Sequence, residues 1–414
     1  MPSRPMLLII GTGSELTHRY MLEAAATEYP LLLIDTRAPT WQRPFVVDHE
    51  TAADLHDMPS LTAAADRLAA RWNVAGVLAL DEYHLMAAAR LAERLQLPGN
   101  TPTAVRAARD KATSRELFMA SDVPSALSTW VHNVAAAASA AERIGGYPVV
   151  LKPAAHAGSV GVVRVDTITS LPAGWSVVCA AAAHQGPEGQ GVLLEEVLDG
   201  PEISVATVTQ HGVTTAVAVT HKETGLEPYF VETAQTVTAD DPLLPTLAPV
   251  AESALHALGI TTGVSHVEMR LTAFGPHLVE VNTRPGGDHI SELIRYATGV
   301  DLVRAAASIA CGQRPDLRPT QKQTAAIGMV HPPGPGTVTA REVLDGDDEH
   351  VEQFHWLCDV GDQVTLTPSC HTPNNTRAGF GIVTGSTAKE TRARLAGLLD
   401  RAVVTVSSPV ADAA

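Results

Sequence analysis

Short apolar runs alternate with amphipathic stretches over the first hundred residues. The apolar runs lie at 7–10, 31–35 and 77–80, and the amphipathic stretches lie near 15–28, 61–72 and 83–95. A short apolar run between turn residues is typical of a buried strand, and strands that alternate with helices build a parallel sheet. The sequence therefore predicts a doubly wound parallel α/β unit at the start of the chain.

The pattern changes to paired strands after residue 110. Alternating hydrophobic positions predict a strand at 191–196 and hairpins that join 147–152 to 162–165, 202–209 to 214–220, and the two halves of 263–282. Helices are predicted near 112–120, 247–258 and 289–298, and a loop is predicted at 223–245. Residues 320–414 are predicted as a separate β-rich unit with one helix near 387–400. Antiparallel sheets are therefore expected after the α/β unit.

The hairpin across 263–282 brings two acids together. Its turn is centred near Phe274, so Glu268 and Glu280 face each other with Cβ atoms about 5 Å apart, and Asn282 lies on the same face. Such like charges repel unless a cation lies between them, and oxygen ligands suit Mg²⁺ with substrate phosphates. The alternative is a solvated strand face with two unrelated acids, which a bulge would produce by slipping the register.

Candidate anion-binding groups lie on both sides of this hairpin in the sequence. Lys152 ends an apolar strand and precedes the small-residue loop 155–161, which is either a plain hairpin turn or a wrap of backbone amides around an anion. Arg284 and the amides of Gly286 and Gly287 precede a predicted helix, whose N-terminus favours anions. Asp288 is predicted as the N-cap of that helix.

A strand at 191–196 ends in two acids and is followed by a turn and a third acid. The segment runs Leu194-Glu195-Glu196-Val197-Leu198, then Asp-Gly-Pro, then Glu202. It is either an edge turn with solvated carboxylates or a hinge that holds a nucleotide. In the hinge interpretation, Glu195 and backbone groups read adenine and Glu202 binds ribose hydroxyls.

Taken in order, these elements resemble the ATP-grasp superfamily over about residues 6–310, and the C-terminal unit resembles the extra domain of the L-amino-acid ligase branch. The matching motifs are Asp110-Lys111, Leu151-Lys152-Pro153, Leu194-Glu195-Glu196, Pro201-Glu202, His266-Val267-Glu268 and Glu280 to Arg284. The resemblance implies a mixed α/β and α+β ATP-grasp fold. Its expected parts are an N-terminal doubly wound parallel α/β domain (1–110), a β-hairpin lid subdomain (111–200), an antiparallel-sheet catalytic subdomain (201–318) and a C-terminal β-rich ligase domain (319–414).

The resemblance further implies ATP and two Mg²⁺ ions as cofactors, with Mn²⁺ as a substitute. The residues implied to contact the nucleotide are Lys111, Lys152, His156, Gly158, Ser159, Glu195, Glu196, Leu198 and Glu202. The implied metal ligands are Glu268, Glu280 and Asn282, and the implied catalytic residues are Arg284 and Lys152. The implied substrate contacts are Glu232, Arg284, Gly286 and Gly287, with Gln235 at a position where related ligases often have histidine.

The implied activity is an ADP-forming ligase that joins a small carboxylate to an amine, such as two amino acids, through an acyl phosphate. Two alternatives stay open: another ATP-grasp chemistry, such as bicarbonate activation or purine-precursor ligation, and a nucleotide-binding module without turnover. The sequence names neither the acyl donor nor the amine.

Charge and composition narrow the classes of partner that the protein is expected to bind. Acidic residues outnumber basic ones by 45 to 29, which argues against a nucleic-acid partner because such affinity rests on neutralised phosphates. No apolar run is long enough to span a membrane. We therefore expect a cytoplasmic enzyme of small molecules, and a homodimer is left open. Only five of the basic residues are lysines, which makes Lys111 and Lys152 conspicuous as phosphate ligands.

Overall fold

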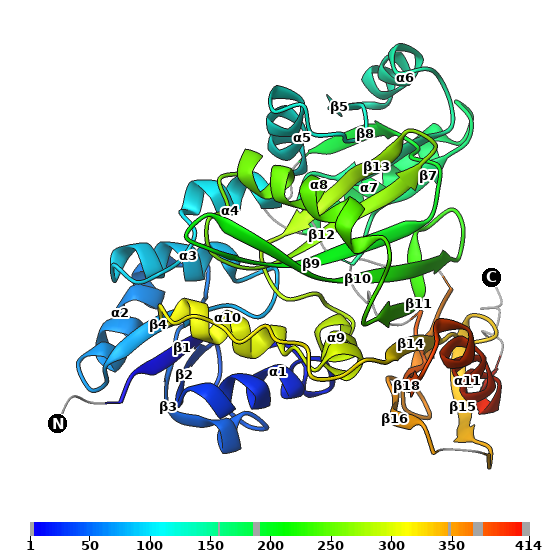
Figure 1. The fold of residues 1–414 in the computed structure, drawn as a ribbon. Helices are drawn as coiled ribbons and strands as arrows, with labels where there is room; N and C mark the ends of the chain where they lie inside the picture. The colour runs from blue at the N-terminus through cyan, green and yellow to red at the C-terminus, as the bar shows by residue number, and fades with distance from the viewer. Residues whose placement is uncertain (1–3, 156–157, 185–190, 347–348, 367–375, 408–414) are drawn as a thin grey trace.

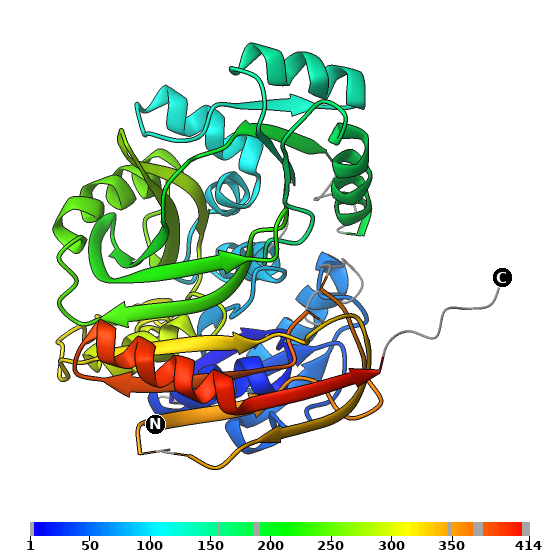
Figure 2. The same cartoon turned by 90° about the vertical axis from the view of Figure 1, so that its right-hand side faces the viewer.

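The computed structural model describes residues 4–155, 158–184, 191–346, 349–366 and 376–407. Within these residues the strands form four sheets, one of them eight-stranded (Figure 1). The N-terminal sheet and the lid sheet lie at opposite ends of the molecule, and the strands of the eight-stranded sheet within residues 202–282 lie between them, whereas its strands after residue 323 lie level with the N-terminal sheet (Figure 2). The predicted mixed α/β and α+β architecture is confirmed. No helix in the described ranges is long and apolar enough to cross a membrane.

The N-terminal sheet is parallel and has the strand order β3-β2-β1-β4, as expected of a doubly wound unit. The sequence prediction missed β3, because this edge strand is half-exposed and carries polar residues. It also placed β4 a few residues late. The strands are β1 (Met6–Ile10), β2 (Leu31–Asp35), β3 (Val46–Thr51) and β4 (Val74–Leu78). The helices are α1 (Glu15–Glu28), η1 (Arg43–Phe45), α2 (Met58–Ala69), α3 (Leu85–Arg94) and α4 (Pro102–Arg109).

The lid sheet is antiparallel and has the order β5-β8-β6-β7. Its predicted hairpin is confirmed by the pairing of Val149 with Val165. Helix α5 leads into this sheet, and alanines and valines of α6 and α7 cover it. The elements are α5 (Lys111–Ala120), β5 (Ser128–Val131), α6 (Val134–Arg143), β6 (Val149–Pro153), β7 (Val163–Val165), α7 (Leu171–His184) and β8 (Val192–Glu196).

The eight-stranded sheet has the order β13-β12-β9-β10-β11-β14-β18-β16. The loop predicted at 223–245 is wrong, because this segment contains the end of β10 and all of β11. Buried polar residues such as Gln235 hide the strand pattern of β11. The elements are β9 (Glu202–Gln210), β10 (Val213–Gly225), β11 (Val231–Thr238), α8 (Leu244–Ala257), β12 (Gly263–Thr272), β13 (Gly275–Asn282), α9 (Ile290–Thr298) and α10 (Leu302–Ala310).

The strands of residues 319–414 belong to two sheets, because β14, β18 and β16 extend the eight-stranded sheet beyond β11. Helix α11 packs its Leu395 and Leu398 against Ala326 and Val383 of this sheet. Strands β17, β15 and β19 form a small sheet of their own. The elements are β14 (Thr324–Val330), β15 (Gly336–Val343), β16 (Val351–Trp356), β17 (Gln363–Val364), β18 (Gly379–Gly385), α11 (Ala388–Arg401) and β19 (Ala402–Ser407). The four-part division of the chain stays a prediction, and hydrogen bonding continues across its last boundary.

Candidate functional site

The β12–β13 hairpin places Glu268 directly opposite Glu280, as the sequence predicted. The pairing depends on a bulge: Met269 pairs with Leu278, so an unbroken ladder would put Val279 opposite Glu268. Val279 is the extra residue, and its carbonyl accepts a hydrogen bond from Arg115 at 2.6 Å. A bulge was the feature expected to break the predicted pairing, but the bulge at Val279 is what brings Glu268 opposite Glu280.

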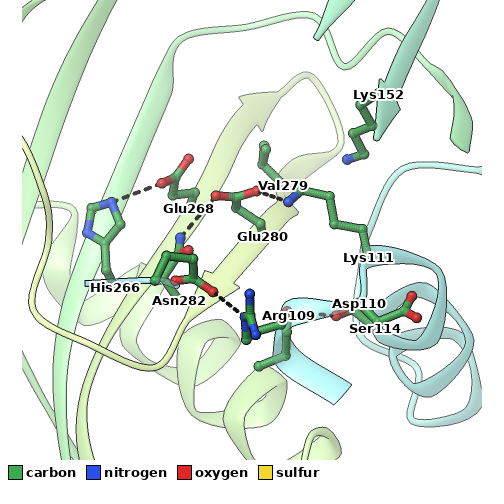
Figure 3. Close-up of polar contacts among 12 residues, drawn as sticks. Arg109, Asp110, Lys111, Ser114, Lys152, His266, Glu268, Val279, Glu280 and Asn282 are labelled. Carbon is green, nitrogen blue, oxygen red and sulfur yellow. Dashed lines mark hydrogen bonds and ion pairs between the residues drawn. The ribbon is translucent and has the colours of Figure 1, made fainter. Parts of the chain in front are cut away.

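Cationic and amide groups surround this pair (Figure 3). The Lys111 Nζ lies 2.9 Å from Glu280 Oε2, and the Asn282 amide donates to Glu280 Oε1 at 3.0 Å. The His266 Nε2 lies 3.0 Å from Glu268 Oε1. Burial disfavours the charged form of Glu280, but the Lys111 ammonium and the Asn282 amide together hold the pKa of Glu280 below its ordinary value. Lys222 and His266 likewise hold the pKa of Glu268 below its ordinary value against burial, so both carboxylates are ionised at neutral pH.

The donor chemistry of Glu268, Glu280 and Asn282 fits Mg²⁺. All three side chains offer oxygen, the ligand type that this cation prefers. The two like charges sit opposite each other, and the lysines beside them are the kind of counter-charge that a divalent ion would replace. The metal assignment itself stays a prediction.

Two further carboxylates gather next to Glu268. Carboxylate oxygens of Glu202, Glu232 and Glu268 lie within 4.8 Å of one another. Lys222 lies among them, with its Nζ 2.7 Å from Glu232, 3.2 Å from Glu268 and 3.8 Å from Glu202. Burial opposes the charge on Lys222, but these carboxylates raise its pKa well above the ordinary lysine value. Lys222 thus stays charged and keeps the acids together.

A second buried charge cluster joins helix α5 to the lid sheet. Glu195 receives the Lys152 ammonium and the Arg115 guanidinium, whose Nε lies 2.9 Å from Glu195 Oε1. Burial lowers the pKa of Lys152 to about 8, because the nearby Glu195 charge only partly offsets the loss of water. The Glu195 side chain thus binds Lys152 and Arg115 in this structure, and its predicted adenine contact stays a prediction. Sequence reasoning missed Arg115, although it lies one helical turn after Lys111.

These groups line a cleft with about 870 Å³ of empty space between the lid and the eight-stranded sheet. The predicted residues on its wall are Lys111, Lys152, Gly158, Ser159, Glu195, Glu196, Leu198, Glu202, Glu232, Glu268 and Glu280. Asn282, Arg284, Gly286 and Gly287 lie outside this wall, although Asn282 bonds Glu280. His156 lies outside the described residues. The cleft therefore brings together the predicted lid residues, hinge and hairpin, and the nucleotide site itself stays a prediction.

Glu202 is held by an arginine that sequence reasoning missed. Arg270 lies opposite Glu202 in the β12–β9 ladder, and its Nη2 lies 2.8 Å from Glu202 Oε2. Opposite charges at facing positions are a common stabilising pair, so the register of β12 would have revealed it. The Arg270 guanidinium also lies over the ring of Phe230, 5.3 Å from its centroid. Both residues line the cleft.

Arg284 is fixed by an acid from the N-terminal unit. Its Nε lies 3.1 Å from Glu82 Oε2, and the other oxygen of Glu82 lies 3.2 Å from Arg109 Nε. Glu82 is 8% exposed, and sequence reasoning did not single it out. The predicted N-cap of α9 is wrong: the N-cap is His289, and the Asp288 side chain pairs with Arg377 instead of capping the helix.

Glu232, a predicted substrate contact, lies where Lys222 and Gln235 meet. The Gln235 amide donates to one oxygen of Glu232, and Lys222 binds the other. Burial raises the pKa of Glu232 despite Lys222, and the charges of Asp288, Glu268 and Glu202 add to the rise. Gln235 itself is fully buried. The carboxylates of Glu202, Glu268 and Asp288 thus lie near Glu232, and Lys222 binds it directly.

Comparisons with known proteins agree with this geometry. Residues 145–292 match the ATP-grasp domain family. The chain is 29% identical over 301 residues to the uncharacterized protein y4rH of Sinorhizobium fredii, covering 71% of this chain and 60% of that protein. It is 31% identical over 257 residues to carnosine synthase 1 of Homo sapiens, covering 56% of this chain and 30% of that protein. The chain thus spans less than two thirds of these relatives.

Among solved structures, an L-amino acid ligase from Bacillus licheniformis superposes with a TM-score of 0.80 at 21% identity. The match covers 98% of this chain and 99% of the ligase. The chain therefore contains an ATP-grasp domain, at residues 145–292, and shares its overall fold with an L-amino acid ligase.

Proposed function

We propose that the protein is an ATP-dependent carboxylate–amine ligase that forms an amide bond between two small molecules, at least one of them an amino acid. The observation that carries the proposal is the hairpin pair of Glu268 and Glu280, set beside Lys111 at the wall of the cleft that Lys152 also lines. Similarity to carnosine synthase and to an L-amino acid ligase supports the substrate class.

The chemistry follows from the weakness of a carboxylate as an electrophile. A carboxylate oxygen attacks the γ-phosphorus of ATP, the bond to the β–γ bridging oxygen breaks, and ADP leaves. The amine nitrogen then attacks the acyl phosphate, a C–N bond forms, and phosphate leaves as the amine gives up a proton. No covalent enzyme intermediate is needed, so the protein's work is alignment and charge stabilisation.

The chain's residues divide this work. Lys111 and Lys152 bind ATP phosphates, and Arg284 stabilises the phosphoryl group in transfer. Glu202 holds the ribose, and the backbone of Glu196 and Leu198 reads the adenine. Glu268, Glu280 and Asn282 hold Mg²⁺, which when bound neutralises charge on the phosphate oxygens. Glu232 receives the ammonium group of an amino-acid substrate, because it lies on the cleft wall beside the carboxylates of Glu202 and Glu268.

The other ATP-grasp chemistries use the same nucleotide site and differ in the acyl group. Bicarbonate activation needs no ammonium-binding acid, and the half-buried Glu232 with its two partners favours an amino acid instead. A module without turnover would have no use for opposed carboxylates at the cleft. A cytoplasmic location and a homodimeric state are retained from the sequence as proposals.

The test is phosphate release by the purified chain with MgATP, screened over pairs of amino acids and related small amines. We expect release that requires both partners, and a product whose mass equals the sum of the two minus water. Release with bicarbonate alone would favour the alternative chemistry, and nucleotide binding without release under any condition would favour the module.

A further inference from the structure

The loop of residues 286–289 has an unusual backbone. Asp288 and His289 both have positive φ, at +47° and +59°. Aspartate and histidine tolerate this region better than most residues, yet two in succession persist only where their surroundings enforce the conformation. The loop follows Arg284 directly and contains the two glycines assigned to substrate. Its shape therefore sets where these groups lie.

One arginine from the C-terminal part of the chain binds this loop. The Arg377 Nη1 lies 2.9 Å from Asp288 Oδ1, and its Nη2 donates to the backbone carbonyl of Glu232 at 3.3 Å. The Arg377 side chain is only 14% exposed, so water weakens this charge-assisted contact little. Burial would raise the pKa of Asp288, but Arg377 outweighs it and lowers that pKa. A single guanidinium thus ties the loop to β11.

His289, the next residue, contacts side chains of both the N-terminal unit and the C-terminal segment. The His289 ring stacks on Tyr20 of α1 at 4.9 Å between centroids and lies 4.6 Å from the ring of Phe380 in β18. Its Nδ1 lies 2.9 Å from Glu292 Oε2. The N-terminal unit and the C-terminal segment therefore meet at this loop.

We propose that Arg377 is a positioning residue of the catalytic centre. Through Asp288 and the Glu232 carbonyl, it holds the 286–289 loop so that Arg284 and the glycine amides face the reacting groups. Residues 319–414 carry none of the groups assigned to ATP or Mg²⁺, and this contact gives them a role in the reaction. The role in turnover rests on the proposed function, whereas the order of the loop does not.

The first experiment compares Arg377→Ala with Arg341→Ala by hydrogen exchange. Arg341 is a matched control, because it lies in the same C-terminal segment and binds a carboxylate and a carbonyl, those of Asp359 and Cys358, away from the loop. We expect the amides of residues 284–292 to exchange about tenfold faster in Arg377→Ala and at the wild-type rate in Arg341→Ala, because only Arg377→Ala removes the contact between Arg377 and the loop. Unchanged exchange in Arg377→Ala would overturn the proposal, whatever the protein catalyses.

The second experiment measures kinetics and MgADP affinity. Arg377→Ala should lower kcat about tenfold or more, while the MgADP dissociation constant changes less than about twofold, because the cleft residues keep their contacts. Loss of nucleotide affinity in proportion to kcat would indicate a general structural defect and contradict the positioning role.

A variant of Asp288, the partner of Arg377, keeps the proposal testable if Arg377→Ala does not fold. Asp288→Asn keeps the size of the side chain and removes its charge, so it should shift exchange and kcat in the same direction. The double variant should be no worse than Arg377→Ala alone. Independent, multiplying effects of the two substitutions would show that the pair does not act as one unit.

Discussion

Glu268 lies opposite Glu280 because Val279 bulges out of the β12–β13 ladder. The bulge is anchored, since the Val279 carbonyl accepts from Arg115 at 2.6 Å, and Arg115 in turn binds Glu195 beside Lys152. The hairpin acids and the lid lysine are thus linked by one buried guanidinium. This link connects the two walls of the nucleotide cleft.

Glu280→Gln should abolish turnover, with kcat reduced about 100- to 1,000-fold, because the amide removes a charge that we propose holds Mg²⁺ opposite Glu268. Amino-acid-dependent phosphate release measures the effect. Glu50→Gln is the control, since Glu50 pairs with two exposed arginines of the N-terminal unit, Arg67 and Arg71. Product formation at the wild-type rate in Glu280→Gln would refute the metal assignment.

ATP affinity should fall as pH rises above about 8. The pKa of Lys152 is lowered to about 8 by burial, so its ammonium loses a proton in this range and with it the attraction to phosphate. The change is at most about tenfold per pH unit, as expected for one proton. Titration of ATP between pH 7 and pH 10 measures it. Lys152→Met should bind weakly with a flat profile, and a flat profile in the wild type would count against this role.

Glu82→Gln should lower kcat about 10- to 100-fold with little change in the KM for ATP, because Arg284 loses the charge that orients it. Glu82→Asp should recover part of the rate. Asp66→Asn, which disturbs only a surface pair with Arg94, serves as the control. An equal rise in the KM for ATP would place Glu82 in nucleotide binding instead.

The two glycines after Arg284 should differ in their tolerance of alanine. A Cβ on Gly286 would lie 3.0 Å from the Ile290 Cβ and 3.1 Å from the His266 Nδ1, which forces a shift. A Cβ on Gly287 would meet Arg284 Nη1 at an ordinary 3.8 Å. Gly286→Ala should therefore destabilise the fold by about 1–3 kcal/mol and reduce activity, and Gly287→Ala should do neither. Thermal unfolding and kcat of the two variants test this prediction. A larger loss of stability and activity in Gly287→Ala than in Gly286→Ala would show that the loop packs differently.

Local patterns predicted the parts of the fold whose residues alternate cleanly. The β12–β13 hairpin was predicted because its apolar positions alternate, and the alternation of strands and helices in the N-terminal unit was predicted because its central strands are short apolar runs buried on both faces. Strand β11 was taken for a loop, because Gln235 and Thr236 are polar and yet buried. No local signal marks such a strand, since its burial depends on neighbours distant in the sequence.

The residues of the site likewise divide into those that the sequence pattern indicated and those that it missed. Motif order indicated the residues on the cleft wall, but Arg115, Arg270, Glu82 and Arg377 were missed. Each of them acts by pairing with a charged group far away in the sequence, as Arg377 does with Asp288 across 89 positions. Spacing along one element cannot reveal such pairs, although the facing register of β12 and β9 would have indicated Arg270.

Transfer of oxygen from the carboxylate substrate to phosphate tests the central proposal most directly. The acyl donor identified by the phosphate-release screen is labelled with a heavy oxygen isotope in its carboxylate, and the released phosphate is analysed by mass spectrometry. An acyl-phosphate ligase must deliver one labelled oxygen to each phosphate. Unlabelled phosphate, with amide product still formed, would contradict the account.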